Sequence, residues 1–262
     1  MKEKSKKILG NHVETRNLND LVITDNFRGR ITFISETACG WQNQLENTCP
    51  TKALSKKDDA MALDNGKCIM CGYCAESFPQ LIKMENKCPS PTKSKNKLIE
   101  YSTPQEQLSE KSYEQMGKEL KEKITKLFGR SLAIRQVDAG SCNGCEIEIT
   151  ALNNPIYDID RFGIHFVSSP RHADVLLVTG PASRNMETAL LRTYETTPSP
   201  KIVIAAGACA CSGGIFGDTY ATTGGIDKII HVDVYIPGCP PRPEVLIQGL
   251  LLAVDRMIIN GI

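Results

Sequence analysis

Eleven cysteines in two groups constrain this 262-residue chain more than any other feature of its sequence. Six of them lie between Cys39 and Cys88, and five lie between Cys142 and Cys239. The first residues are basic but lack the apolar segment of a secretory signal peptide, so we expect the chain to stay in a reducing cytoplasm. In that compartment, the cysteines are better explained as metal ligands than as disulfide partners.

The first group contains a run that is typical of bacterial ferredoxins. In the stretch CIMCGYCAESFP, Cys68, Cys71 and Cys74 keep the spacing that places three thiolates around a 4Fe–4S cube. The fourth cysteine of the usual run precedes a proline, and Phe78 occupies that position here, before Pro79. In two-cluster ferredoxins, the fourth cysteine of each run binds the cluster of the other run. The missing ligand is therefore expected upstream.

The upstream segment RGRITFISETACGWQNQLENTCPTKAL has the same rhythm and supplies that ligand. Cys49 occupies its fourth position, directly before a proline, and completes a set with the three cysteines of the downstream run. The second set would consist of Cys39, Gln42, Leu45 and Phe78, and three of these residues cannot bind iron. We therefore predict one 4Fe–4S cluster and one abandoned site in which Leu45 and Phe78 serve as apolar packing. Cys39 would be a leftover buried thiol and Cys88 a free linker thiol, and a zinc site made of the same cysteines is the alternative.

The chain beyond residue 130 predicts a different kind of domain. Apolar, β-branched runs alternate with helix-like segments, including 188–195 and a long helix opened by Pro243, and this pattern favours a parallel sheet covered on both faces. The runs are LAIRQVD (132–138), ADVLLVTG (173–180), KIVIAAG (201–207) and VDVYIPG (232–238). We predict an α/β domain with a parallel flavodoxin-like sheet, preceded by a smaller α+β ferredoxin-like domain.

Three of these predicted strands lead directly into glycine-flanked cysteines. The segments GSCNGCE, GACACSGG and PGCPPRPE would lie at the carboxyl ends of parallel strands, where such folds bind ligands. A pair from one strand end and single cysteines from two others supply the four thiolates of a second 4Fe–4S cluster. They are Cys142, Cys145, Cys209 and Cys239, with Cys209 favoured over Cys211 because the glycine flank recurs there. A redox-active pair of thioredoxin type at Cys142 and Cys145 is the alternative.

Four segments of this half together resemble a known family. GSCNGCEIEI, SSPRHADVLLVTG, GACACSGGIFGD and VDVYIPGCPPRPE are similar to the small electron-transfer subunit of energy-converting, formate hydrogenlyase-type nickel–iron hydrogenases, which is related to the 20 kDa subunit of complex I. The resemblance spans residues 116 to 258 and implies that the four cysteines named above bind the proximal cluster. Complex I-type subunits carry two adjacent cysteines where this chain separates Cys142 from Cys145, and that spacing resembles the hydrogenase branch. The N-terminal half departs from this family and resembles a separate ferredoxin-like subunit, fused here.

The resemblance implies an oxidoreductase subunit that is not catalytic alone. It would relay electrons between a donor, either ferredoxin or a formate dehydrogenase partner, and the nickel–iron site of a separate large subunit, for H2 evolution or uptake. A membrane arm, other iron–sulfur subunits and a place on the inner face of the cell membrane are further expectations. The alternatives are a complex I-like module that reduces quinone or sulfur compounds, and a freestanding ferredoxin-type carrier. The formal charge of +1, without a basic run, argues against nucleic-acid binding.

We divide the chain into an N-terminal extension (1–29), a ferredoxin-like domain (30–87), a linker with an amphipathic helix (88–130) and the cluster-binding α/β domain (131–262). Apolar residues at helical spacing between Tyr113 and Leu127 predict the helix, which would pack on its own domain or dock on a partner or the membrane surface. Glu146 would interact with a helix dipole or take part in proton coupling beside the cluster. Arg171 and His172 would be solvated in a loop or lie near the anionic cluster.

Overall fold

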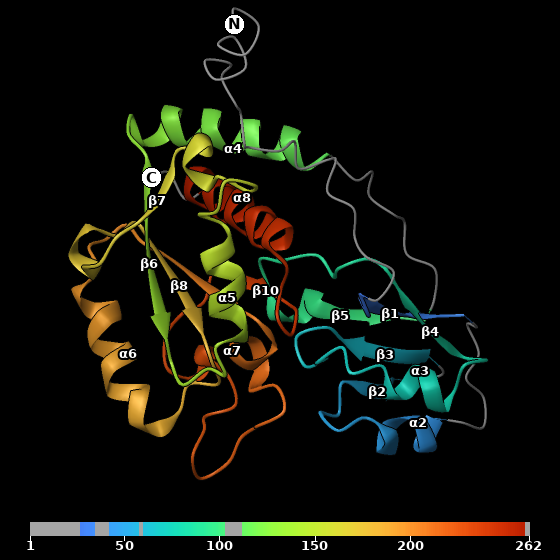
Figure 1. Ribbon diagram of the computed structural model, residues 1–262. Coiled ribbons are helices and arrows are strands. Elements are labelled where there is room, and N and C mark those ends of the chain that lie inside the picture. The colour runs from blue at the N-terminus through green and yellow to red at the C-terminus, as the bar shows by residue number, and fades with distance from the viewer. Residues whose placement is uncertain (1–26, 35–41, 58–59, 103–111, 260–262) are drawn as a thin grey trace, which may run out of the picture.

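The computed structural model describes residues 27–34, 42–57, 60–102 and 112–259, which form two halves lying side by side (Figure 1). The C-terminal half is built on five parallel strands: β6 (Leu132–Asp138), β7 (Ile164–Phe166), β8 (Val175–Thr179), β9 (Ile202–Ala206) and β10 (Val234–Ile236). Their order across the sheet is β10-β9-β8-β6-β7. This is the flavodoxin-like order, in which the first strand lies between the second and the third. The predicted parallel sheet is confirmed.

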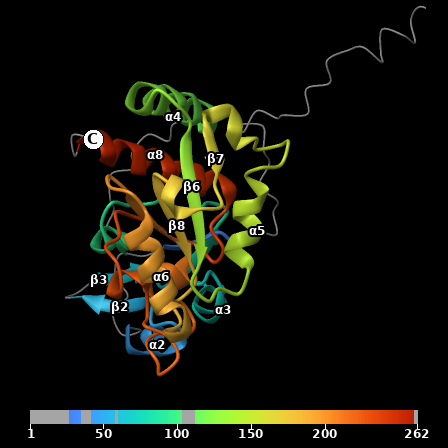
Figure 2. The ribbon, with the colours of Figure 1, turned by 90° about the vertical axis from the view of Figure 1, so that its left-hand side faces the viewer.

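Successive residues of a strand point to opposite faces of the sheet, and the strands of this sheet are buried on both faces. Helices therefore cover each face. Val175 and Leu177 of β8 belong to the core shared with α4, α5 and α8, whereas Leu176 and Val178 belong to the core shared with α6 and α7. Figure 2 shows α5 and α6 on opposite sides of β6 and β8. The helices are α4 (Tyr113–Phe128), α5 (Gly144–Ala151), α6 (Arg184–Thr196), α7 (Ala208–Ser212) and α8 (Pro243–Ile259), with 3-10 turns η3 (Ile159–Phe162), η4 (Pro170–His172) and η5 (Ile226–Lys228).

The predicted amphipathic helix is α4, and the C-terminal half covers its apolar face. Leu120 and Ile124 are almost completely buried in the core that also contains α8. Lys123 forms an ion pair of 2.5 Å with Asp255 of α8. Gly129 ends the helix with φ of 62°, a backbone conformation that glycine adopts without a steric penalty. Of the two alternatives for this helix, packing on its own domain is correct.

In its described residues, the N-terminal half contains two small antiparallel sheets and two short α-helices. One sheet pairs β1 (Arg30–Phe33) with β4 (Ile82–Glu85), and the other contains β2 (Leu54–Lys57), β3 (Ala60–Asp64) and β5 (Ile99–Tyr101), beside α2 (Gln42–Thr48) and α3 (Tyr73–Ser77). This confirms the α+β class expected for this half. Leu45 and Phe78 lie in its apolar core, as expected of side chains that serve as packing. Gln42 begins α2, while Cys39 lies outside the described residues.

Residues 88–102 of the segment expected as a linker connect the two halves. Thr92 exchanges backbone hydrogen bonds of 2.9 and 2.8 Å with Tyr235 of β10. In η2 (Lys95–Leu98), Lys95 forms an ion pair of 2.7 Å with Asp227, and Leu98 is buried in the core of the C-terminal half. Strand β5 then returns to the N-terminal sheet. The two halves are therefore docked through this segment.

None of the helices in the described ranges has both the length and the apolar character needed to cross a membrane. The ten cysteines of the described residues are free thiols.

Two candidate cluster sites at the junction of the halves

The second cysteine group gathers at the carboxyl edge of the parallel sheet, as predicted. Cys142 follows β6, Cys145 lies in the first turn of α5, Cys209 lies in α7 after β9, and Cys239 follows β10. This edge faces the bottom of Figure 1, where the arrowheads of β6 and β8 point. Cys142 and Cys239 are exposed, whereas Cys145 is buried. The fold therefore brings together residues from three separate strand ends.

The four thiols are close enough to act on one another electrostatically. Burial raises the pKa of Cys145, and the charges of Glu146, Cys209, Cys239 and Cys142 raise it further. Burial likewise raises the pKa of Cys209 to about 11, with contributions from Cys239 and Cys142. Thiolates in such a cluster need a positive counterpart, which bound iron would supply.

Glycine backbones approach the sulfur atoms in this cluster of thiols. A Cβ atom on Gly207, whose φ is +92°, would lie 2.6 Å from the Sγ atom of Cys145. A Cβ atom on Gly214 would lie 2.8 Å from the Sγ atom of Cys209. A side chain at either position would collide with a cysteine sulfur atom, so only glycine fits there. Without side chains, the backbone N–H groups can come close to a bound sulfur-rich group. The donor set and its glycine surroundings fit a 4Fe–4S cluster.

Cys211 is directed away from this set. Cys211 is completely buried against β9 and β10. Its Sγ atom lies 3.7 Å from the carbonyl oxygen of Ala205 and 3.6 Å from that of Ile236. Burial raises its pKa, and the other charges that act on it belong to Lys95, Asp64 and Asp227 rather than to cysteines. Of the two cysteines in GACAC, Cys209 is the one that faces the other thiols.

Four cysteines of the first group gather in the N-terminal half: Cys49 directly after α2, Cys68 and Cys71 in the loop after β3, and Cys74 in α3. Burial raises the pKa of Cys68 to about 12, and the charges of Cys74, Cys49 and Cys71 contribute to this shift. The pKa of Cys74 is raised to about 11, again mainly by burial. Backbone N–H groups donate to two of the sulfur atoms, from Ala53 to Cys49 at 3.2 Å and from Met70 to Cys68 at 3.4 Å. Four thiols with N–H groups directed at their sulfur atoms fit an iron–sulfur cluster, whose properties such hydrogen bonds tune.

Within the described parts of the chain, no three His, Cys, Asp or Glu side chains are arranged to hold one metal ion. A 4Fe–4S cube presents four separate irons, each bound by one thiolate, so its ligands surround a larger volume.

The two candidate sites are neighbours across the junction of the halves. After burial and Cys142, the charge of Cys71 is the next largest cause of the raised pKa of Cys239. The hydroxyl of Ser212, next to Cys211, donates a hydrogen bond of 2.6 Å to the carbonyl oxygen of Gly66, which shortly precedes Cys68. Loops that belong to different halves, and to distant parts of the sequence, therefore lie against each other where the thiols are.

Glu146 has contacts that relate to both of its expected roles. It lies in the first turn of α5, where a carboxylate interacts favourably with the helix dipole. The hydroxyl of Thr179 donates a hydrogen bond to its Oε1 atom. Its Oε2 atom is buried and has no hydrogen-bond partner among the described residues.

Arg171 and His172 are far from the cysteines along the strand direction. They form η4, which precedes β8 and therefore lies at the amino edge of the sheet, and both side chains are exposed. There they line a surface pocket with Phe128, Asp174 and Pro200. The solvated-loop alternative is correct, and the alternative that placed them near a cluster is wrong.

A buried ionic network beside Cys239 was missed by the sequence analysis. The guanidinium of Arg242 lies 2.9 Å from the carboxylate of Glu244, whose side chain is only 5% exposed, and the Tyr157 hydroxyl donates to the same carboxylate at 3.4 Å. Burial raises the pKa of the neighbouring Glu148 carboxyl. The charge of Arg242 lowers this pKa, and the charge of Glu244 raises it. The charged residues of PGCPPRPE, which closely follow the predicted ligand Cys239, are the sequence feature that could have predicted this network.

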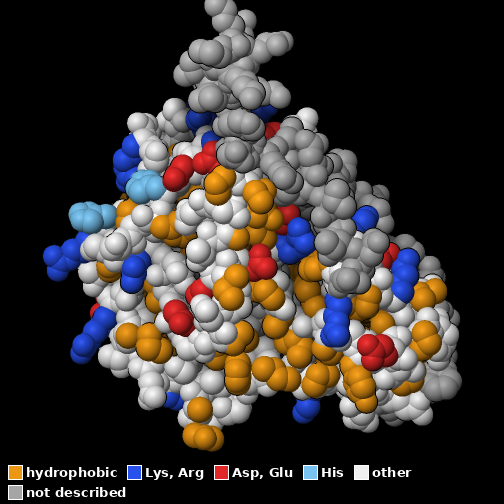
Figure 3. Space-filling model, viewed as in Figure 1, with side chains coloured by type: hydrophobic (Ala, Val, Ile, Leu, Met, Phe, Trp, Pro, Cys, Tyr) orange, Lys and Arg blue, Asp and Glu red, His pale blue; other side chains and the backbone are white. Residues whose placement is uncertain are grey.

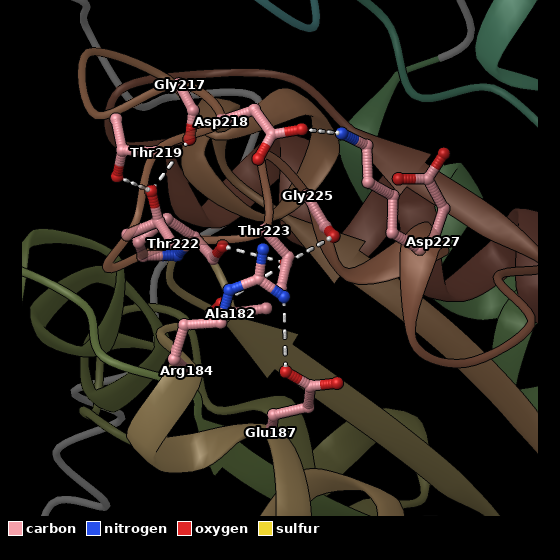
Figure 4. Close-up of polar contacts among 12 residues, drawn as sticks. Ala182, Arg184, Glu187, Gly217, Asp218, Thr219, Thr222, Thr223, Gly225 and Asp227 are labelled. Carbon is pink, nitrogen blue, oxygen red and sulfur yellow. Dashed lines mark hydrogen bonds and ion pairs between the residues drawn. The ribbon is translucent and has the colours of Figure 1, made fainter.

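The loop that follows α7 is fixed by its own polar groups and exposes large apolar side chains. Figure 4 shows the side chains of Thr222 and Thr219 directed at each other, and the Thr223 hydroxyl donating to the carbonyl groups of Ala182 and Gly225. The hydroxyl oxygens of Thr219 and Thr222 lie 2.9 Å apart. The charged side chains are paired locally, Asp218 with Lys228 at 2.6 Å and Arg184 with Glu187 at 3.4 Å. Ile215 and Phe216 are about half exposed, and Tyr220 is 97% exposed. Figure 3 shows apolar side chains gathered over the lower part of this face, near this loop and the N-terminal half.

Comparison with known proteins assigns the C-terminal half to a family. The family model for the 20 kDa subunit of NADH ubiquinone oxidoreductase matches residues 142–253. The chain is 50% identical over 134 residues to a probable membrane-bound hydrogenase subunit of Pyrococcus furiosus, covering 51% of this chain and 80% of that protein. It is 52% identical over 138 residues to formate hydrogenlyase subunit 7 of Escherichia coli, covering 53% of this chain and 54% of that protein.

A third relative comes from the quinone branch. An NADH-quinone oxidoreductase subunit of Citrifermentans bemidjiense is 51% identical over 113 residues, covering 43% of this chain and 66% of that protein. Of formate hydrogenlyase subunit 7, the chain spans only about half the length, 54%. Relatives from hydrogenase and quinone oxidoreductase complexes are similar to the chain to nearly the same degree.

Proposed function

Because the chain belongs to the family of the 20 kDa subunit of NADH ubiquinone oxidoreductase, a family of oxidoreductase subunits, we propose that it is the iron–sulfur electron-transfer subunit of a nickel–iron hydrogenase complex. The observation that carries this proposal is the placement of two sets of four cysteines next to each other, with Cys71 close enough to Cys239 to influence its pKa. A chain with two adjacent redox centres suits an electron relay.

Each set of thiols would hold one 4Fe–4S cluster, which when bound accepts and releases single electrons. The first cluster would be bound by Cys49, Cys68, Cys71 and Cys74, and the second by Cys142, Cys145, Cys209 and Cys239. The protein's contribution is to bury the ligands and bring glycine backbones and N–H groups close to the sulfur atoms. The docked halves fix the separation between the two sets.

The exposed apolar side chains around the second set support a partner on that side. Ile147, two residues after Cys145, is 62% exposed, and Ile215 and Phe216 follow Cys209 on the loop described above. Exposed apolar patches of this kind mark protein interfaces. The surrounding charges are paired among themselves, so the partner surface is expected to be largely uncharged. We assign this face to the large subunit that contains the nickel–iron site.

The donor would approach the N-terminal half. Tyr73 lies between Cys71 and Cys74 and is 57% exposed, which leaves an aromatic ring at the surface beside the first set. A soluble ferredoxin or an iron–sulfur subunit linked to formate oxidation is the proposed donor. The relative named as membrane-bound suggests that partner subunits hold the complex on the inner face of the membrane.

A complex I-like module that reduces quinone or sulfur compounds is the second candidate. It is favoured by the similarity to the NADH-quinone oxidoreductase relative, whose identity of 51% lies between the 50% and 52% of the two hydrogenase-type relatives. The spacing of Cys142 and Cys145 favours the hydrogenase candidate, since the complex I branch carries adjacent cysteines there.

The test is to purify the chain anaerobically together with its partners and to determine the metals and the activity of the complex. A partner subunit with stoichiometric nickel, and H2 turnover by the complex, are the expected results. A complex that lacks nickel and reduces quinone or a sulfur compound would identify the second candidate instead. A chain that purifies alone, as a carrier without a partner, would contradict both.

A further inference from the structure

A short segment before the first strand reaches from the N-terminal half to both candidate cluster sites. It is anchored at Gly29, where φ is +66° and a Cβ atom would lie 1.9 Å from the carbonyl oxygen of Glu85. The next residue, Arg30, donates its backbone N–H to the carbonyl of Lys87 at 2.7 Å. Because only glycine fits between this segment and the end of β4, the direction of the two preceding residues is fixed.

Those two residues, Phe27 and Arg28, contact ligand loops that belong to different halves. Arg28 donates a hydrogen bond of 2.5 Å from Nη1 to the carbonyl oxygen of Cys71. The ring of Phe27 lies 5.0 Å from the guanidinium of Arg242, in the loop that begins with Cys239. Arg242 is itself held by the buried carboxylate of Glu244, so Phe27 rests on a fixed partner. One dipeptide therefore ties the Cys71 loop to the Cys239 loop.

We propose that Phe27 and Arg28 are positioning residues that hold the two ligand loops together and place a positive charge at the junction between the clusters. The inference rests on the proposed function, because it concerns transfer of one electron from the first cluster to the second. In that step one cluster is oxidised and the other reduced by one electron, and no bond or proton changes place. A reduced cluster carries one more negative charge than an oxidised one, so the Arg28 guanidinium stabilises the reduced form of the first cluster. Arg28 is exposed, and water screens part of this effect.

The experiment uses the full chain with its clusters, and measures the midpoint potential of each cluster and the magnetic coupling between the two reduced clusters by electron paramagnetic resonance. In Arg28→Ala, we expect the potential of the first cluster to fall by about 59 mV, a tenfold change in a one-electron equilibrium, while that of the second cluster stays unchanged. The coupling should weaken, because the Cys71 loop loses its anchor. Arg28→Lys keeps the charge and should restore the potential.

Two further variants separate the roles of the segment. Phe27→Ala should weaken the coupling but leave the potential of the first cluster unchanged, since the ring carries no charge. Arg30→Ala is the matched control, because this cation faces Glu85 and Glu100 instead of a ligand loop. It should change neither quantity.

The outcomes distinguish this inference from the proposed function. About eight iron atoms in the wild-type chain are required by the two-cluster function, and a smaller number would overturn that function itself. If all variants keep eight iron atoms, and Arg28→Ala and Phe27→Ala match the wild type in potential and coupling, the positioning role is overturned and the function stands. If Arg28→Ala loses a cluster, Arg28→Lys and Phe27→Ala decide the question by the same two measurements.

Discussion

Ser212 donates a hydrogen bond of 2.6 Å from its hydroxyl to the backbone carbonyl of Gly66, across the junction of the two halves. Ser212 ends the short helix that carries Cys209, and Gly66 belongs to the loop that leads into Cys68. Gly66 is buried, and a Cβ atom there would lie 2.7 Å from the Leu98 side chain and 3.5 Å from the Cβ atom of Cys211. The contact therefore joins the ligand-bearing segments of both halves directly.

Ser212→Ala tests the energetic value of that contact. The substitution leaves a buried carbonyl without its partner, so we expect the free energy of unfolding to fall by about 1–3 kcal/mol. Denaturant unfolding of the variant and the wild type measures the difference. Thr125→Ala is the matched control, because the Thr125 hydroxyl also donates to a backbone carbonyl, but on the exposed face of α4. Its effect should stay within about 0.5 kcal/mol, and equal effects of both substitutions would contradict a special role for the junction.

Leu120→Ala tests the packing of α4 on the C-terminal half. Leu120 is completely buried, so its truncation should lower the free energy of unfolding by about 2–5 kcal/mol through lost burial and a cavity. Lys121→Ala changes the exposed neighbouring position and should have an effect within about 0.5 kcal/mol. A small effect of Leu120→Ala would mean that α4 is held to this half only loosely.

The iron content of the chain tests the two cysteine sets. Anaerobically purified chain should contain about eight iron atoms and eight acid-labile sulfides, as two 4Fe–4S clusters. Cys49→Ser should remove the same cluster as Cys71→Ser, although the two residues are distant in sequence, whereas Cys39→Ser should leave the cluster content unchanged. About twelve iron atoms would show that the abandoned site is occupied, and stoichiometric zinc would refute both clusters.

The Glu148 carboxyl makes stability depend on pH. Burial raises its pKa above the ordinary value of 4.5, Arg242 lowers it, and Glu244 raises it. Because the folded state binds this proton more tightly than the unfolded state, the stability that it contributes is present at low pH and is lost as the pH rises through the folded-state pKa. Relative to the wild type, Glu148→Gln should therefore be more favourable at about pH 7 than at about pH 4.

The measurement for Glu148 is urea unfolding of the cluster-free chain at both pH values. Glu122→Gln serves as the control, because Glu122 lies on the exposed face of α4 and should show the same small effect at both. A Glu148→Gln difference that does not change with pH would contradict the raised pKa.

Much of the C-terminal half was predictable because its signals are local. Continuous apolar runs predicted β6, β8, β9 and β10, and glycine-flanked cysteines predicted the carboxyl edge at which four thiols meet. Strand β7 was missed, since its three residues Ile164–Phe166 are too few to show a pattern and depend on pairing with β6. The preference for Cys209 over Cys211 followed from the glycine flank, Gly207, where a Cβ atom would lie 2.6 Å from the Sγ atom of Cys145.

The junction of the halves was less predictable, because it depends on contacts between distant segments. The amphipathic pattern of α4 fixed its buried face but could not identify α8 as its neighbour. The segment 88–98 is rich in proline, serine and lysine, which is typical of a linker, yet Lys95 and Leu98 are held by Asp227 and the core of the other half. The composition of a segment predicts solvent exposure only where the rest of the chain offers no residues for that segment to pack against or pair with.

The last prediction concerns the order of electron flow and uses Cys74→Ser in the assembled complex. Cys74 is buried in the N-terminal half, away from the second set of thiols, so this substitution should remove the first cluster and leave the second. H2 turnover coupled to ferredoxin or formate should then be lost, because the donor reaches the complex through the first cluster. Turnover with a small artificial dye that reaches the second cluster directly should survive.

The matched control for that variant is Cys88→Ser, which removes a half-buried thiol packed against the core of the C-terminal half, outside both sets. It should leave both activities intact. Equal loss of dye-linked and donor-linked turnover in Cys74→Ser would mean that the N-terminal half supports the structure of the complex but does not carry electrons. Iron analysis of the Cys74→Ser complex must show that the second cluster is retained, because only then does a selective loss of donor-linked turnover place the first cluster before the second. The docked geometry gives the physical reason to expect this order: the first set meets the second at Cys71 and Cys239, so an electron that enters near the exposed ring of Tyr73 has its next acceptor within the same chain.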